Sequence, residues 1–128
     1  MTQDDIQAVI DKLPTLGAFG LGLYLAGRDM DRDREELLRS TERCTRVCEW
    51  LADLKPTKYV SGIYGSYGLK HIAEEEIGYI TNGVFIASAV HCGFPFQPYR
   101  NSPNVAFGIS AKSIKAKEAA NRVREKRL

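Results

Sequence analysis

The chain has 128 residues, of which 44% are hydrophobic and 27% charged, and its formal net charge is +2. This profile is typical of one soluble globular domain with enough core to fold without disulfides or a structural metal. The uncharged apolar run at residues 13–27 is shorter than the roughly 20 residues of a membrane helix, and three aspartates precede it, so we expect neither a membrane span nor a secretory signal.

The first two predicted elements are helices near the N-terminus. Residues 4–13 repeat an apolar side chain on each turn, with Thr2 as N-cap and Pro14 as the stop. The glycine-rich run 15–27, TLGAFGLGLYLAG, is apolar all round. We expect a helix there as well, one that depends on burial rather than on helix propensity because of its glycines.

The clearest helical pattern covers residues 31–54. Leucine, valine and cysteine side chains recur there at helical spacing, which predicts one amphipathic helix. On its charged face, Glu35 precedes Arg39 and Glu42 precedes Arg46 by four residues, the favourable order, so we expect two ion pairs.

The three cysteines are Cys44, Cys48 and Cys92. Cys44 and Cys48 lie one turn apart on the apolar stripe of this helix. Because the chain has only one further cysteine and two histidines, we expect core packing and no metal site. An odd number of cysteines without paired spacing predicts free thiols and a reducing, cytoplasmic location.

The middle of the chain predicts a loop and two helices. Residues 59–68 mix tyrosine, glycine and serine without a helical period, which indicates a loop or a short strand. Ser66 is expected to cap a helix that Gly78 ends, and Thr81 or Asn82 to cap the next one, GVFIASAVHC. This second helix is almost wholly apolar, which places it at the centre of the fold.

Two extended runs then flank a turn at residues 100–103 and predict a β-hairpin over residues 94–110. Ser110 or Ser113 caps a basic C-terminal helix over residues 111–128. The predicted fold is therefore mainly α, a single domain over residues 1–128 with a small β-hairpin. Residues 66–110 have the order of a winged helix-turn-helix.

In a winged helix-turn-helix domain the second helix enters the major groove of DNA and reads base edges with polar side chains near its start. Only Thr81 and Asn82 are available for this here, because Ser88 is the one polar residue among residues 83–90. We therefore expect no sequence-specific reading by this helix. Any nucleic acid would be bound through its phosphates.

Charge is distributed unevenly along the chain: the net charge is −4 over residues 1–54, +1 over residues 55–111 and +5 over residues 112–128. Such basic tails commonly bind phosphates or an acidic protein face, and the alternative role is a solvated helix end. The tail has few apolar residues, so we do not expect it to join the core. Its candidate binding residues are Lys112, Lys115, Lys117, Arg122, Arg124, Lys126 and Arg127.

Tyrosines near lysines form a second group of candidates, because exposed rings beside cations can stack on bases or on a partner's apolar surface. One further polar residue joins them because it stands at a helix start. The group comprises Lys55, Lys58, Tyr64, Tyr67, Lys70 and Asn82.

His71 stands three residues before Glu74 and four before Glu75 on the first of the two middle helices. An acid–base role for this trio is the alternative to an ordinary charged helix face. The chain contains none of the recognised metal, phosphate-loop or nucleophile motifs. We therefore expect no enzymatic activity and no cofactor.

The pattern SYGLKHIAEEEIGYITNGVFIASAVHCGF, followed by SPNVAFGIS, resembles small uncharacterised proteins of bacterial plasmids and prophages over roughly residues 48–113. The resemblance implies a bacterial cytoplasm and a mobile element, and it carries no activity. We expect a non-enzymatic nucleic-acid-binding accessory protein of such an element. The alternative is a small inhibitor or adaptor that binds a host nucleic-acid-processing or defence complex, and the sequence leaves a homo-oligomer open.

Overall fold

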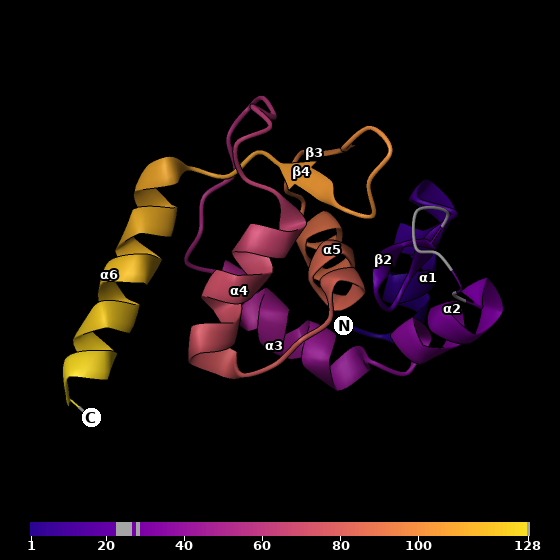
Figure 1. Cartoon of the computed structure of the whole chain (residues 1–128), viewed down its shortest axis with the longest axis horizontal. Helices are drawn as coiled ribbons and strands as arrows, with labels where there is room; N and C mark the ends of the chain where they lie inside the picture. The colour runs from indigo at the N-terminus through magenta and orange to yellow at the C-terminus, as the bar shows by residue number, and fades with distance from the viewer. Residues whose placement is uncertain (23–26, 28, 128) are drawn as a thin grey trace.

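The predicted mainly helical fold with a small β-hairpin is confirmed by a computed structural model that describes residues 1–22, 27 and 29–127. The helices are α1 (Gln3–Lys12), α2 (Met30–Leu38), α3 (Thr41–Leu51), α4 (Ser66–Ile77), α5 (Asn82–His91) and α6 (Ala111–Arg127). The strands are β1 (Leu16–Gly17), β2 (Gly20–Leu21), β3 (Phe96–Pro98) and β4 (Val105–Phe107). Figure 1 shows α5 in the middle, with α4 and then α6 on one side and α1, α2 and β2 on the other.

Helix α1 follows its sequence pattern closely. The Thr2 hydroxyl accepts the N–H of Asp5 at 3.1 Å, and the Asp5 carboxylate accepts the N–H of Thr2 at 2.8 Å, which forms a reciprocal capping box. Ile6, Val9 and Ile10 are buried. The N-cap and the apolar face predicted from the sequence are confirmed.

The helix predicted over residues 15–27 is wrong where the structure describes it. Residues 16–21 form the antiparallel hairpin β1–β2, and residues 23–26 and 28 lie outside the described part of the chain. Gly20 has a φ of +119°, and a Cβ there would come within 2.6 Å of the Pro103 carbonyl oxygen. An apolar run without a polar face does not distinguish a buried helix from a buried turn. Here the positive φ of Gly20 and the close approach of the Pro103 carbonyl favour the turn.

The single helix predicted over residues 31–54 is in fact two helices. The Ser40 N–H donates to the Leu37 carbonyl at 3.0 Å, and the Ser40 hydroxyl donates to the Glu36 carbonyl at 2.9 Å. Serine thus offers the backbone an alternative to the helical ladder, and α2 ends before α3 begins at Thr41. The apolar period continues through the break, because α2 and α3 direct Leu37 and Cys44, respectively, into the core.

The N-cap of helix α4 lies one residue earlier than predicted. Gly65 is the N-cap, and Ser66 is the first helical residue, whose hydroxyl accepts the N–H of Val105 at 3.1 Å. The serine was predicted to cap the helix, but its hydroxyl anchors β4 instead. At the other end, Gly78 has a φ of +84°, as a glycine stop requires.

Helix α5 is the centre of the core, as predicted. Every residue from Asn82 to Val90 is buried, and the Thr81 hydroxyl caps the helix at the N–H of Val84. The Phe85 ring packs edge-on against Trp50 and Phe107. Because neighbouring elements cover α5, it cannot enter a DNA groove, although residues 66–110 do have the predicted order of helices and hairpin.

The predicted C-terminal hairpin and the start of α6 are also present. Strands β3 and β4 pair antiparallel, and the Ser110 hydroxyl accepts the N–H of Ser113 at the start of α6. Ile114 of α6 is fully buried in the core cluster. The expectation that the basic tail stays out of the core is therefore wrong at its first turn. Among the residues that the structure describes, no helix has both the length and the apolar character needed to cross a membrane.

Candidate functional site

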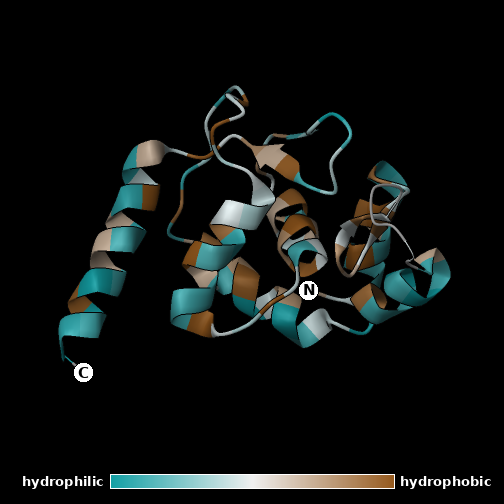
Figure 2. Cartoon of the chain, in the orientation of Figure 1, coloured by the Kyte–Doolittle hydropathy of each residue, from teal (hydrophilic) through white to brown (hydrophobic). Residues whose placement is uncertain are grey.

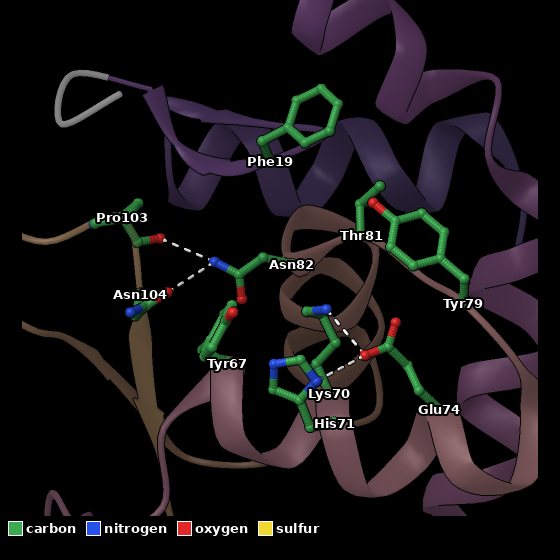
Figure 3. Close-up of a pocket in the computed structure, with 10 residues that line it drawn as sticks. All are labelled: Phe19, Tyr67, Lys70, His71, Glu74, Tyr79, Thr81, Asn82, Pro103 and Asn104. Carbon is green, nitrogen blue, oxygen red and sulfur yellow. Dashed lines mark hydrogen bonds and ion pairs between the residues drawn. The ribbon is translucent and has the colours of Figure 1, made fainter. Parts of the chain in front are cut away.

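A cleft of about 600 Å³ opens between α4, the start of α5, the β1–β2 turn and the loop before β4 (Figure 3). Two long-range backbone hydrogen bonds hold these parts together. The Gly83 N–H donates to the Ala18 carbonyl at 2.9 Å, and the Leu21 N–H donates to the Pro103 carbonyl at 3.0 Å. The cleft is lined by Phe19, Tyr67, Lys70, His71, Glu74, Tyr79, Thr81, Asn82, Pro103 and Asn104.

One side of α4 supplies an ion cluster to the cleft. The Glu74 Oε1 atom lies 3.0 Å from the Lys70 Nζ and 3.0 Å from the His71 Nδ1. The other carboxylate oxygen accepts the N–H of Ile80 at 3.2 Å. The Lys70 and Glu74 side chains are only 8% and 16% exposed, so the pair is largely shielded from water. The predicted contact between His71 and Glu74 is confirmed, whereas Glu75 is exposed and outside the cluster.

These contacts set the charge state of Glu74. Burial acts to raise the pKa of its carboxyl, but the hydrogen bonds from Lys70 and the Ile80 N–H, together with the charges of Lys70 and His71, outweigh it. The pKa of Glu74 therefore lies below its ordinary value of 4.5. At neutral pH the cleft contains a carboxylate and an ammonium that balance each other.

Aromatic rings enclose the ammonium of Lys70. Its Nζ lies 5.3 Å from the centre of the Tyr67 ring and 5.6 Å from the centre of the Tyr79 ring, within range of cation–π attraction. The Tyr67 ring also meets His71 edge-on, with 4.4 Å between ring centres. Tyr67 and Tyr79 are themselves 54% and 67% exposed, so they form the outer wall of the cleft.

Asn82 provides the least satisfied polar group of the cleft. Its side-chain nitrogen donates to the Asn104 Oδ1 at 2.9 Å and to the Pro103 carbonyl at 3.4 Å, which fixes the orientation of the amide (Figure 3). The Oδ1 of Asn82 is buried and has no hydrogen-bond partner, and the whole residue is 7% exposed. An unsatisfied buried carbonyl is costly and marks a place for a missing donor.

A second candidate surface belongs to α6, which rests against α3 and α4 along one face. The Lys117 Nζ lies 3.1 Å from the Asp53 carboxylate, 3.8 Å from that of Glu76, and 5.1 Å from the centre of the Trp50 ring. The buried Asn121 amide donates to the Ile72 carbonyl at 3.3 Å. These contacts hold α6 along much of its length.

Two of the basic residues predicted to bind phosphates are therefore used inside the protein. Lys117 is only 11% exposed, and Arg124 pairs with Glu76 and donates a hydrogen bond to Asn121. Their role in phosphate binding was predicted from charge alone. Both side chains lie on the docked face of α6, and their role in phosphate binding stays a prediction.

The other basic residues of α6 point away from this docked face. At about 100° per residue, positions 112, 115, 122 and 126 fall on one side of the helix. All four side chains, and that of Arg127, are exposed, and the ion pairs of α6 with other described residues involve only Lys117 and Arg124. Figure 2 shows α6 as mostly hydrophilic beside the more apolar centre. We call the set Lys112, Lys115, Arg122 and Lys126 the basic stripe.

The remaining predicted site residues fall in two places. Tyr67, Lys70 and Asn82 come together in the cleft, where Lys70 and Asn82 are buried and Tyr67 is exposed. Lys55 and Lys58 are exposed in the segment between α3 and α4, where Tyr64 is half-buried. None of these three lines the cleft. Lys55 lies beside the start of α6, where its N–H donates to the Ser113 hydroxyl at 3.4 Å.

The cysteines differ in their chemistry. Burial raises the pKa of the Cys44 thiol to about 11, whereas a hydrogen bond from Cys92 lowers the pKa of the Cys48 thiol to about 7. That hydrogen bond and burial raise the pKa of Cys92 above its ordinary value. All three cysteines are free, and the described residues contain no group of three or more histidine, cysteine, aspartate or glutamate side chains that could hold a metal ion.

Comparison of the chain with protein-family models, with curated proteins and with solved structures finds no match. The arguments for function therefore rest on the cleft, the basic stripe and the sequence itself.

Proposed function

We propose that the protein is a non-enzymatic nucleic-acid-binding accessory protein whose basic stripe on α6 contacts phosphates. The observation that carries the proposal is the division of α6 into two faces. Lys117, Asn121 and Arg124 hold one face against the body of the protein, and the four cations of the basic stripe remain exposed on the other. A solvated helix end would not need to be fixed in this way.

The dimensions of the basic stripe suit a nucleic-acid backbone. From position 112 to position 126 a helix rises by about 21 Å, since each residue adds about 1.5 Å. Ala119 lies within the stripe and is exposed, and its side chain is too small to keep a phosphate backbone at a distance at that position. Lysine and arginine contacts of this kind fix affinity without reading sequence.

The setting of the proposed function comes from the sequence. The resemblance to small proteins of plasmids and prophages supports an accessory role for a bacterial mobile element in the cytoplasm. The proposal includes no cofactor and no catalytic residue.

The test is a titration of mixed-sequence duplex and single-stranded DNA between about 50 and 200 mM salt. The double variant Lys115→Glu with Arg122→Glu should weaken binding and reduce the slope of log K against log salt by about two units, one for each phosphate that is no longer neutralised. The control, Lys12→Glu with Arg43→Glu, makes the same change in net charge at exposed residues of α1 and α3. Absence of salt-dependent binding, or an equal loss in the control, would overturn the proposal.

One observation favours the alternative of a protein partner. The loop between α3 and α4 projects beside β3 and β4 (Figure 1), and it exposes Tyr59 to 74% and Ile63 to 77%. Exposed apolar side chains at a loop tip are typical of protein contacts. An inhibitor or adaptor that uses this loop would lose binding to its partner on Ile63→Ser, with little dependence on salt.

A further inference from the structure

We infer that the cleft between α4 and α5 binds a nucleobase that carries an amino group. The inference does not depend on the basic stripe. Tyr67, Lys70 and Glu74 stand on the side of α4 facing the cleft. Glu76, which meets α6, lies about 160° away from Glu74 around the same helix. The two surfaces can therefore be tested separately.

The unsatisfied Asn82 carbonyl defines what the ligand must donate. Both donor positions of the Asn82 amide are engaged by Asn104 and Pro103, so the amide cannot turn round. Its Oδ1 is left as an acceptor in a residue that is more than nine-tenths buried. A ligand N–H satisfies this atom, and the exocyclic amino groups of adenine, cytosine and guanine are donors of that kind.

The walls of the cleft define the shape and charge of the ligand. Tyr67, Tyr79 and Phe19 bring three aromatic rings to one opening, which favours a flat ring that can stack. Lys70 and Glu74 neutralise each other at 3.0 Å, so a charged ligand would find no uncompensated partner between them. A neutral heterocycle with polar edges meets both conditions, and a volume of about 600 Å³ admits a nucleoside.

Access to Asn82 is controlled by the outer wall. The Oδ1 atom is closed to solvent, so a ligand reaches it only when a side chain of the wall moves. Among the residues that line the cleft, we assign this movement to Tyr67, because it is 54% exposed.

The probes are adenosine, cytidine and guanosine, titrated calorimetrically into the whole protein. We expect saturable binding of at least one of them. Purine riboside, which is adenosine without its amino group, should bind roughly tenfold more weakly than adenosine, because Asn82 Oδ1 is again left without a donor. Because this comparison changes the ligand and not the protein, a folding defect cannot imitate it.

Substitutions in the outer wall of the cleft provide a second test of nucleoside binding. Tyr79→Ala should weaken binding of the nucleoside roughly tenfold, because the base has one ring fewer on which to stack. The matched control is Tyr59→Ala, since Tyr59 is a similarly exposed tyrosine that also lies near a lysine, 5.4 Å from Lys58 Nζ, but outside the cleft. The control should bind as the unmodified protein does.

Two sources of the base are then separated by comparing the nucleoside with a short single strand of the same base. Tighter binding of the strand than of the nucleoside, weakened by Tyr79→Ala, identifies an unpaired base of a nucleic acid; equal binding identifies a free nucleoside. Either result supports the inference. It is overturned if none of the three nucleosides binds at millimolar concentration, if purine riboside binds as well as adenosine, or if Tyr59→Ala weakens binding as much as Tyr79→Ala.

Discussion

Helices α5 and α6 both pack against α4, one on each side, and they do so by different physical means. Helix α5 is buried from Asn82 to Val90, whereas Ile114 and Asn121 are the buried residues of the longer α6. The first helix is held by apolar area and the second by a few ion pairs and hydrogen bonds. Apolar burial is the larger contribution to stability, so α5 defines the fold while α6 is attached to it.

The same contrast holds for the charges on the two sides of α4. Toward α5, Lys70 and Glu74 are enclosed and paired, so their geometry is fixed. Toward α6, the docked cations serve attachment, and the basic stripe stays available to a partner. Enclosed charges are suited to recognising one shape of ligand, and exposed charges to binding any dense array of phosphates.

The largest expected effect comes from truncating the centre of α5. Phe85→Ala should lower the free energy of unfolding by roughly 3–5 kcal/mol, because Phe85 is fully buried between Trp50 and Phe107 and its removal leaves a cavity. Urea denaturation followed by circular dichroism measures this. Val123→Ala on α6, where the side chain is 50% exposed, should change stability by less than about 0.5 kcal/mol. Similar losses of stability in both variants would show that α5 and α6 do not differ in their contribution to stability.

The next largest effect concerns the enclosed ion pair. Lys70→Met should cost about 2 kcal/mol at neutral pH, because it leaves the mostly buried Glu74 carboxylate without its main partner. The control is Arg39→Met, which breaks an exposed pair with Glu35 at the same four-residue spacing and should cost less than about 0.5 kcal/mol.

Acid should remove the stability difference between Lys70→Met and the unmodified protein. The direction of this pH dependence follows from the pKa of Glu74. That pKa is lowered in the folded protein, so the stabilisation is present above the ordinary value of 4.5 and is lost as the pH falls through the folded value. Lys70→Met and the unmodified protein should therefore approach each other in stability as the pH falls through the folded pKa of Glu74, which lies below 4.5. A difference that persists unchanged in acid would mean that Lys70 acts through packing instead.

The sequence predicted elements that depend on local signals. The N-cap at Thr2, the glycine stop at Gly78 and the apolar run of α5 each depend on neighbouring residues, and each is present. The hairpin at residues 16–21 was missed because its geometry depends on contacts with Asp33 and Pro103, which are distant in the chain. The break at Ser40 was missed because the apolar period continues across it.

The candidate site was predictable in part for the same reason. Tyr67, Lys70, His71 and Glu74 share one face of one helix, and periodicity is enough to bring them together. The role of Asn104 was not visible, because it follows Asn82 by 22 residues and meets it only through the fold. Which cations of α6 are free could not be predicted either, since that depends on the positions of Asp53 and Glu76.

A smaller effect is expected at the attachment of α6. Asn121→Ala should lower the free energy of unfolding by about 1 kcal/mol, because it leaves the Ile72 carbonyl without that side-chain donor. Arg122→Ala, at the next position but exposed, is the control and should be neutral. If both substitutions are neutral, Asn121 does not attach α6 to α4. The separation of α6 into a docked face and an exposed basic stripe would then be wrong.

The smallest effect tests whether the basic stripe has the direction proposed here. Ala119→Lys adds a cation within the stripe, and Ala120→Lys adds the same cation about 100° farther round the helix; both alanines are exposed. Neither should alter stability by more than about 0.5 kcal/mol. Ala119→Lys should strengthen binding to mixed-sequence DNA a few-fold at low salt and increase the salt slope by about one unit, because one more phosphate is neutralised. Ala120→Lys changes net charge equally and should give less than half of that increase, since its ammonium points away from the bound backbone. Equal increases would mean that overall charge, and not the face formed by Lys115 and Arg122, determines binding.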